Sequence, residues 1–179
     1  FHDGAKLKPA SGVTVTLAKG YTASQKQHVF DVSAGGNCWS SKPSNSTQYH
    51  WGAVGDAVTN DTTFIQKAID NAIYFDGSKH LKLAQGRHAI TTLSLYYGST
   101  VGYNTIILEG SGDAYVADSQ FAGTSFISSS WENAIEINST RGVRIRNLTV
   151  LGPWNTHITT ADMAGAACAV DSSVEANWI

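Results

Sequence analysis

Residues 50–72 read HWGAVGDAVTNDTTFIQKAIDNA, and this stretch decides how the rest of the chain is interpreted. Apolar side chains recur three and four positions apart through and just beyond its second half, at Ile65, Ala68, Ile69, Ala72 and Ile73. That spacing places them along one face of an α-helix. We predict a helix of about 13 residues ending near Asp76 and Gly77. Another part of the protein must cover its apolar face.

The start of this helix is predicted from side chains that can accept hydrogen bonds from free backbone N–H groups. Asn60, Asp61 and Thr62 are all suitable N-terminal caps. Thr63 and Gln66 keep the three-residue spacing of a capping box. We therefore expect structural roles in the cap and in the preceding turn, rather than catalytic ones, for Asp56, Asn60, Asp61 and Thr62.

Short segments of alternating apolar and polar residues follow the helix. They predict strands at 79–83, 91–95, 105–109, 134–138 and 143–150. The glycines between them fit either a β-sandwich or a parallel solenoid. Residues 134–140 align with 167–173 at an offset of 33 with two identities. Stacked coils need such a repeat because each coil buries its inner face only against its neighbours, so the sequence favours the solenoid.

The first 48 residues indicate a small β-rich connector. Residues 13–17 alternate and predict a short strand, and 28–32 predict a second one that ends at Gly35. The Ser-rich segment between Gly35 and Gln48 buries little apolar area and is typical of a linker. We therefore divide the chain into a connector, 1–48, and a helix with the first strands of a larger fold, 49–179. We expect that fold to continue beyond the last residue.

Composition and charge exclude several classes of protein. The chain holds 19 Ser, 17 Thr and 17 Gly, and only 15% of its residues are charged. With a net charge of −2 and no run of like charge, we expect no nucleic-acid partner. Apolar runs fall far short of the roughly 18 residues that a membrane helix needs, so we expect no membrane insertion. Cys38 and Cys168 have no metal or redox spacing, which favours free, packed thiols over a disulfide; we expect no metal and no cofactor.

The helix region resembles a known family. Residues 52–62 (GAVGDAVTNDT) and 65–70 (IQKAID) resemble the motif that opens pectate-lyase-like, right-handed parallel β-helices, and bacteriophage tailspikes and tail fibres match best. Their motif reads approximately F-G-A-x-G-D-G-x-x-D-D-T-x-A-I-Q-x-A-I-D. This chain departs from it at Ala57, where a positive φ is costly, and at Asn60, which argues against a cation in this loop. The resemblance covers roughly residues 26–152.

The resemblance implies a fold and a role. The fold is mainly β, a right-handed parallel β-helix with an N-terminal capping α-helix, preceded by the β-rich connector. The implied role is that of a homotrimeric virion tail protein, attached to the phage tail or baseplate through residues 1–48, which recognises a polysaccharide on the host surface. The alternative is a polysaccharide depolymerase, a lyase or a glycoside hydrolase, whose active site lies on the β-helix flank mostly beyond this segment. A third interpretation is a monomeric glycan-binding adhesin.

Carboxylates offer little support for catalysis within this segment. Glu109 and Asp113, and Glu132 and Glu136, stand four residues apart. A glycoside hydrolase needs two carboxyl groups about 5–10 Å apart, whereas residues four apart on a strand are separated by about 13 Å. We expect such side chains to lie in solvent or to pair with the arginines of 143–150. No pattern separates the possible lyase bases from ordinary surface residues: His80, Arg87, His88 and Tyr103.

Aromatic side chains are the better candidates for glycan binding, because sugar rings stack on aromatic faces. Trp131, Trp154, Tyr96 and Tyr97 lie beside Ser, Gly or Asn in predicted loops. We favour the other interpretation of these rings, in which they pack in the trimer interface or cover loop backbone.

Overall fold

The computed structural model describes residues 1–41, 46–75, 79–96, 106–112, 123–128, 133–138, 142–152 and 168–170. Strands dominate these residues, and every strand pairing among them is parallel, so the prediction of a mainly-β chain is confirmed. The N-terminal elements are β1 (Thr14–Leu17), β2 (Asn37–Ser40), the 3-10 helix η1 (Gln48–Trp51) and the helix α1 (Thr62–Tyr74).

Three parallel sheets follow η1, and each is named here by one of its strands. The β4 sheet holds β4 (His80–Lys82), β7 (Ile106–Glu109) and β10 (Val143–Arg146), with β7 central. The β5 sheet holds β3 (Asp56–Asn60), β5 (Gly86–Ile90), β8 (Thr124–Ser128) and β11 (Thr149–Leu151), in that order. The β6 sheet holds β6 (Leu93–Tyr96), β9 (Ile135–Asn138) and β12 (Cys168–Val170), with β9 central.

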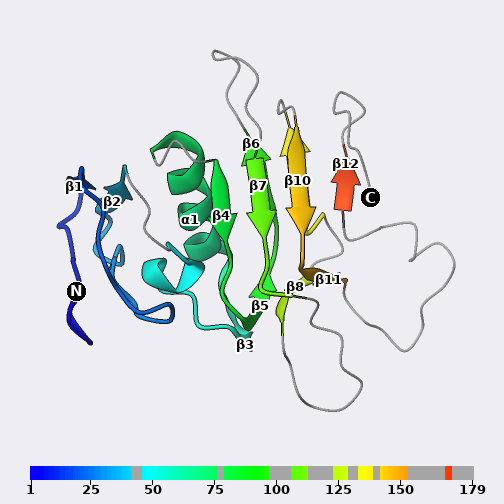
Figure 1. Cartoon of the computed structure of the whole chain (residues 1–179), viewed down its shortest axis with the longest axis horizontal. Helices are drawn as coiled ribbons and strands as arrows, with labels where there is room; N and C mark the ends of the chain where they lie inside the picture. Colours follow the sequence, from blue (N-terminus) through cyan, green and yellow to red (C-terminus); the bar gives the residue numbers. More distant parts are fainter. Residues whose placement is uncertain are drawn as a thin grey trace, which may run out of the picture.

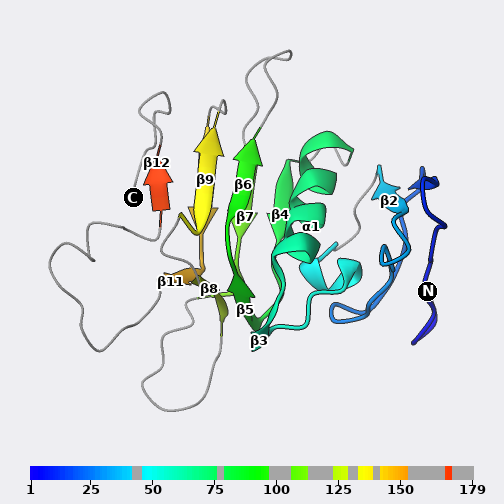
Figure 2. The same cartoon turned by 180° about the vertical axis from the view of Figure 1, so that it is seen from behind.

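The chain visits the three sheets in the same order three times. Strands β4, β5 and β6 form the first round, β7, β8 and β9 the second, and β10, β11 and β12 the third. Figure 1 and Figure 2 show these strands side by side along the long axis, with β12 farthest from the N-terminus. Ile135 pairs with Cys168 and Ile137 with Val170, so the register between β9 and β12 equals the offset of 33 found in the sequence.

Helix α1 lies between the β1–β2 pair and β4 in both views (Figures 1 and 2). All five residues of its predicted apolar stripe are at most 4% exposed, and they join one hydrophobic cluster with Trp51, Leu81 and Leu95. Burial of each isoleucine stabilises the fold by roughly 1.5–3 kcal/mol before the entropy cost. The helix prediction is therefore confirmed in type, in position and in the face that it buries.

Two glutamine side chains, one on α1 and one on η1, pair with backbone groups of β6 and of the corner between β4 and β5. Gln66 of α1 donates to the Ser94 carbonyl and accepts from the Ser94 N–H, at 2.9 and 2.8 Å. Gln48 of η1 does the same with Ala84, at 2.9 and 3.0 Å. Each amide thus takes the place of a neighbouring strand at a first-round segment whose backbone groups need partners. Gln66 was predicted to complete a capping box with Thr63; it bonds to β6 instead.

The N-terminal region differs from its prediction in two places. Strand β2 lies inside the segment predicted as a linker, where it pairs with β1, buries Cys38 and donates the Ser40 N–H to the buried amide of Asn71 in α1. The strand predicted at 28–32 forms only an isolated bridge between Phe30 and Leu7. A longer strand does not form there, because the Val29 and Phe30 N–H groups both donate to the His50 carbonyl instead of to a strand.

The hydrophobic core crosses the boundary placed at residue 48. Tyr21, Val29, Phe30 and Cys38 belong to the same buried cluster as the apolar face of α1. Phe30 packs against Trp51 with ring centroids 5.0 Å apart. The described part of the connector is therefore packed onto the helix that covers the first round of strands.

Strand boundaries also differ after the helix. The single strand predicted at 143–150 is two strands in two sheets, because Asn147 has a φ of 56° and turns the chain between β10 and β11. Asn tolerates this left-handed conformation better than most residues do. Strands β3, β5 and β8 were not predicted. Their sequences, DAVTN, GRHAI and TSFIS, mix polar residues into positions that a buried parallel strand usually fills with apolar ones.

Candidate functional site

The first polar cluster surrounds Asp61, immediately before α1. Asp61 occupies the N-cap position, but its side chain caps no helical N–H group. Its Oδ1 accepts from the Val54 N–H at 2.8 Å, and its Oδ2 accepts from the Gly55 N–H at 2.9 Å and from His88 Nδ1 at 2.6 Å. The predicted capping role of this carboxylate is wrong, since the turn before β3 and strand β5 supply stronger partners than the helix end.

The neighbouring predicted residues order the turn and the start of the helix. Asp56 accepts from the N–H groups of Val58 and Thr59 and from the Thr59 hydroxyl, at 2.7–2.9 Å. These bonds lower the pKa of its carboxyl. Asn60 accepts from the Thr62 N–H at 3.0 Å, and the Thr62 hydroxyl accepts from the Thr91 N–H at 2.9 Å.

His88 and Gln48 complete the buried cluster. The two bonds between Gln48 and Ala84 fix the orientation of the Gln48 amide, so its nitrogen also donates to His88 Nε2, 2.8 Å away. His88 is thereby assigned as the neutral tautomer whose Nδ1–H donates to Asp61. Asp61, His88 and Gln48 are all 0% exposed. They form a structural core, here called the buried triad, that no substrate reaches.

Two glycines beside the buried triad, Gly55 and Gly86, pack closely against Tyr49. Tyr49 donates its hydroxyl to the Gln85 carbonyl at 2.8 Å. A Cβ added at Gly55 or at Gly86 would collide with that hydroxyl. Gly55 also has a φ of 71°, which glycine adopts most easily. The glycine that opens the Gly-Asp turn is therefore required both for its backbone conformation and for the approach of Tyr49.

The second polar cluster lies on the outer face of the β4 sheet. Inward side chains of this sheet, Leu81 and Leu108 among them, are buried, so the alternate side chains point outward. The register places Lys82 opposite Glu109, and Glu109 opposite Arg146. This outer row, with the neighbouring outward residues His80 and Arg144, is called the cationic face below.

Glu109 is the centre of the cationic face. Its Oε2 accepts from His80 Nε2 at 2.7 Å and from Arg146 at 3.0 Å, and its Oε1 accepts from the Asn147 amide at 3.4 Å. The hydrogen bond from Arg146 is the main cause that lowers the pKa of Glu109 below its ordinary value. Pairing of outward carboxylates with the arginines of this segment was predicted, and the Arg146–Glu109 ion pair confirms it.

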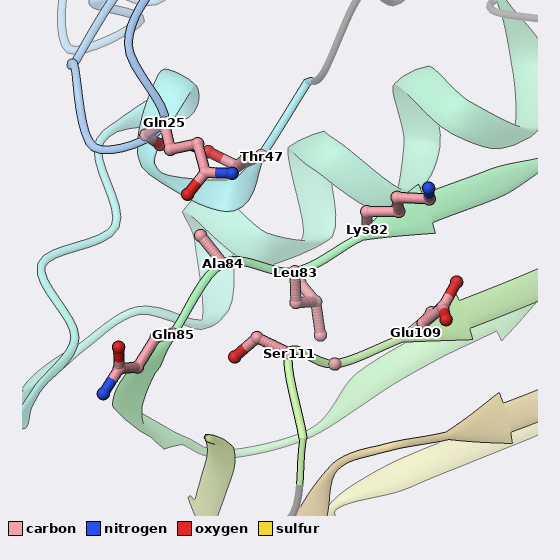
Figure 3. A pocket seen from close by; sticks show the side chains of 9 residues that line it. Gln25, Thr47, Lys82, Leu83, Ala84, Gln85, Glu109 and Ser111 are labelled. Carbon is pink, nitrogen blue, oxygen red and sulfur yellow. The ribbon is translucent and has the colours of Figure 1, made fainter. Parts of the chain in front are cut away.

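A groove of about 400 Å³ adjoins this face. Gln25 and Thr47 of the N-terminal region line it, together with the corner between β4 and β5 (82–85) and the end of β7 (109–111). Figure 3 shows Lys82 and Glu109 at one side of this corner groove and Gln25 and Gln85 at the other. The volume lies within the roughly 300–1,000 Å³ typical of ligand sites. Polar side chains predominate on its walls.

The predicted glycan-binding residues are not placed by these observations. Trp131, Trp154 and Tyr97 lie outside the described residues, and Tyr96 is the last residue of β6, with its side chain outside them. Asp113, Glu132 and Tyr103 also lie outside. Of the bases that the sequence left undistinguished, His80 and His88 now separate clearly: His80 belongs to the cationic face, and His88 to the buried triad.

Sequence reasoning did not find the corner groove or the cationic face as sites. One signal was available, since the alternation in residues 79–83, 105–109 and 143–146 already puts Lys82, Glu109 and Arg146 on the polar side of three strands. What was missing was the register, which decides that the three side chains share one row. Gln25 and Thr47 carry no pattern at all, because their place in the groove depends on how the connector packs.

No family model, no curated protein and no solved structure matches this chain. Within the described ranges, no three His, Cys, Asp or Glu side chains gather in a way that could hold a metal ion. A search of the same residues finds no helix with the length and apolar character needed to cross a bilayer. Cys38 is a free, buried thiol whose pKa is raised by burial to about 11.

Proposed function

We propose that the chain is the N-terminal part of a phage tailspike or tail fibre, in which α1 covers the first coils of a right-handed parallel β-helix that recognises a host-surface glycan. The observation that carries this proposal is the order of the strands. The chain visits three parallel sheets in the same sequence three times, as a coil of three strands per turn does. Connections between parallel strands are right-handed in nearly all proteins, which supports the handedness.

The covered end of the strand stack also supports the proposal. An open first coil would expose both an apolar cross-section and unpaired strand edges. Here α1 buries its apolar stripe next to β4 and β6, β3 pairs with β5, and Gln66 and Gln48 satisfy first-round backbone groups. These are the features that a helix needs in order to cap a β-helix. Strand β3, Gln66 and most of α1 belong to residues 52–70, which resemble the tailspike motif.

Glycan recognition is the activity that the described surface supports best. The corner groove is polar, lies on the outer side of the proposed coils and has the volume of a small-ligand site. Glu109, the carboxylate that lines it, accepts hydrogen bonds from three side chains and has a lowered pKa. Such a carboxylate does not protonate a leaving group at neutral pH. Binding without cleavage is therefore the preferred function for this segment.

Two measurements test the proposal, both on the protein expressed from the full-length reading frame that encodes this chain. Light scattering should give three chains per particle, and immobilised capsule or lipopolysaccharide from a panel of bacterial hosts should retain the protein. A monomer that binds no surface polysaccharide would contradict the proposal. Release of reducing ends or of unsaturated uronate from the bound polymer would instead favour the depolymerase.

A further inference from the structure

The cationic face has a net positive charge, whereas the chain as a whole has a net negative charge. Lys82, Arg144 and Arg146 supply three cations, and Glu109 is the carboxylate among the outward residues of the three strands. In a formal count that leaves histidines out, the face carries a charge of +2, whereas the whole chain carries −2. A local excess of this sign attracts anionic ligands and raises their concentration at the surface.

Hydrogen bonding leaves part of that positive charge available. Both oxygens of Glu109 are engaged by His80, Arg146 and Asn147. Lys82 stands directly opposite Glu109 in the register but forms no ion pair with it, and its side chain is exposed. Glu109 therefore neutralises its other neighbours, and the Lys82 ammonium remains able to bind an anion.

Lys82 belongs to both features, the cationic face and the corner groove. It lines the groove at the side where Glu109 lies, while Gln25 lines the opposite side (Figure 3). Ser111, which also lines the groove, offers a hydroxyl that is already hydrogen-bonded to Thr124 at 3.1 Å. An ammonium at one side and amide and hydroxyl groups at the other match a sugar unit that carries one carboxylate and several hydroxyls.

We propose that the corner groove binds an acidic saccharide unit, with the carboxylate of the sugar at Lys82 and its hydroxyls at Gln25 and Ser111. This inference rests on the proposed function, because it names the class of glycan that the groove selects. It makes the groove a binding site in which the connector takes part, since Gln25 belongs to residues 1–48. Binding there is electrostatically assisted, so it weakens as salt is raised.

The experiment uses matched pairs of polymers. Alginate, polygalacturonate and hyaluronan, each beside its carboxyl-reduced form, are titrated against the chain and against Lys82→Gln. Lys19→Gln is the control variant, because Lys19 is an exposed lysine in the turn after β1. We expect at least one acidic polymer to bind, its reduced form to bind on the order of tenfold more weakly, and Lys82→Gln to cause a loss of the same size. Lys19→Gln should bind like the wild type.

The other outcomes distinguish failure of this inference from failure of the proposed function. Equal binding of acidic and reduced polymers, or an acidic polymer whose affinity Lys82→Gln does not change, overturns the inference and leaves the proposed glycan recognition standing. Binding of the reduced forms alone does the same. Failure of every acidic and reduced polymer to bind overturns the inference, whereas the proposed function falls only if the full-length protein also binds no polysaccharide of the host panel. Circular dichroism and the thermal midpoint of Lys82→Gln establish that the variant is folded; loss of an exposed side chain should leave both unchanged.

Discussion

Asp61–His88 and Glu109–His80 are chemically the same pair in two different environments. Both join a carboxylate oxygen to an imidazole nitrogen, at 2.6 and 2.7 Å. Asp61 and His88 are 0% exposed, whereas the side chains of Glu109 and His80 are 20% and 24% exposed. In the first pair every polar atom must find a protein partner, while in the second pair water can replace a lost one. The buried pair therefore holds the fold together, and the exposed pair shapes a surface charge.

The largest expected effect is that of removing the buried charge. Asp61→Asn replaces an acceptor of three N–H donors by an amide whose NH₂ group meets a donor, so we expect a loss of about 3–5 kcal/mol in the free energy of unfolding. Glu109→Gln is the matched change in the exposed pair, and it should cost less than about 1 kcal/mol. Urea denaturation followed by circular dichroism measures both. Equal losses would show that burial does not distinguish the two pairs.

The two glutamines that pair with backbone groups, Gln48 and Gln66, sharpen the comparison. Gln48→Met leaves the Ala84 N–H and His88 Nε2 without their buried partner and should cost about 2–3 kcal/mol. Gln66→Met frees the Ser94 backbone groups, which water reaches more easily, and should cost about 1 kcal/mol. Thermal unfolding of the two variants side by side tests this ranking. The reverse order would mean that the contact of α1 with β6 matters more than the buried triad.

A pH titration separates buried from exposed groups in another way. Burial lowers the pKa of His50, whose ring accepts from the Tyr21 hydroxyl and donates to the Ser24 carbonyl. Because the unfolded state then binds the proton more tightly, stability is fully present above about pH 6.5 and falls as the pH drops below it. One such proton gives a slope of at most about 1.4 kcal/mol per pH unit.

Folding also lowers the pKa of Glu109, but the effect on stability falls at lower pH than that of His50. A carboxyl whose pKa is lowered by folding contributes stability above its unfolded pKa, near 4.3, and loses it as the pH falls through the folded value. Urea midpoints between pH 8 and pH 3 should therefore fall in two separate steps. His50→Gln should flatten the upper step, and His2→Gln, a change at an exposed histidine, should not. An unchanged upper step in His50→Gln would assign it to another group.

The last effect concerns Ala57 in β3, where the pairing with β5 is irregular. Ala57 has a φ of 69°, a conformation that costs a residue with a Cβ about 1–2 kcal/mol relative to glycine. Ala57→Gly should raise stability by about 1 kcal/mol, part of the gain being offset by the greater freedom of glycine in the unfolded chain. A change at this position of β3 should leave the affinity for acidic polymers unchanged. Destabilisation by Ala57→Gly would show that the alanine side chain contributes packing that outweighs the strain.

The helix and several strands could be predicted because their signals are local. The stripe from Ile65 to Ile73 has a period that only a helix satisfies, and residues 134–138 repeat at the offset that the β9–β12 register uses. Strand β5 escaped prediction because His88, its central buried residue, is polar and is tolerated only by virtue of Asp61 and Gln48. Those partners are 27 and 40 residues away, so no window of sequence contains them.

The corner groove depends even more on distant contacts. Alternation could place Lys82 and Glu109 on outward faces, but their row follows from a register between strands 27 residues apart, and Gln25 joins them only through the packing of the connector. Asp61 illustrates the opposite error. Its position before a helix predicted a cap, yet three N–H donors outside the helix hold the carboxylate. The local sequence predicted that Asp61 stands at the N-cap position, but it could not predict which N–H groups the carboxylate accepts from.

Cryo-electron microscopy of the full-length protein would show directly whether α1 caps a parallel β-helix. We predict three chains around one axis, each with α1 over the end of a continuous stack of parallel strands in three sheets, and with Lys82, Glu109 and Arg146 in one outward row. Antiparallel pairing of β4, β7 and β10, with α1 lying along the outside of two packed sheets, would contradict it.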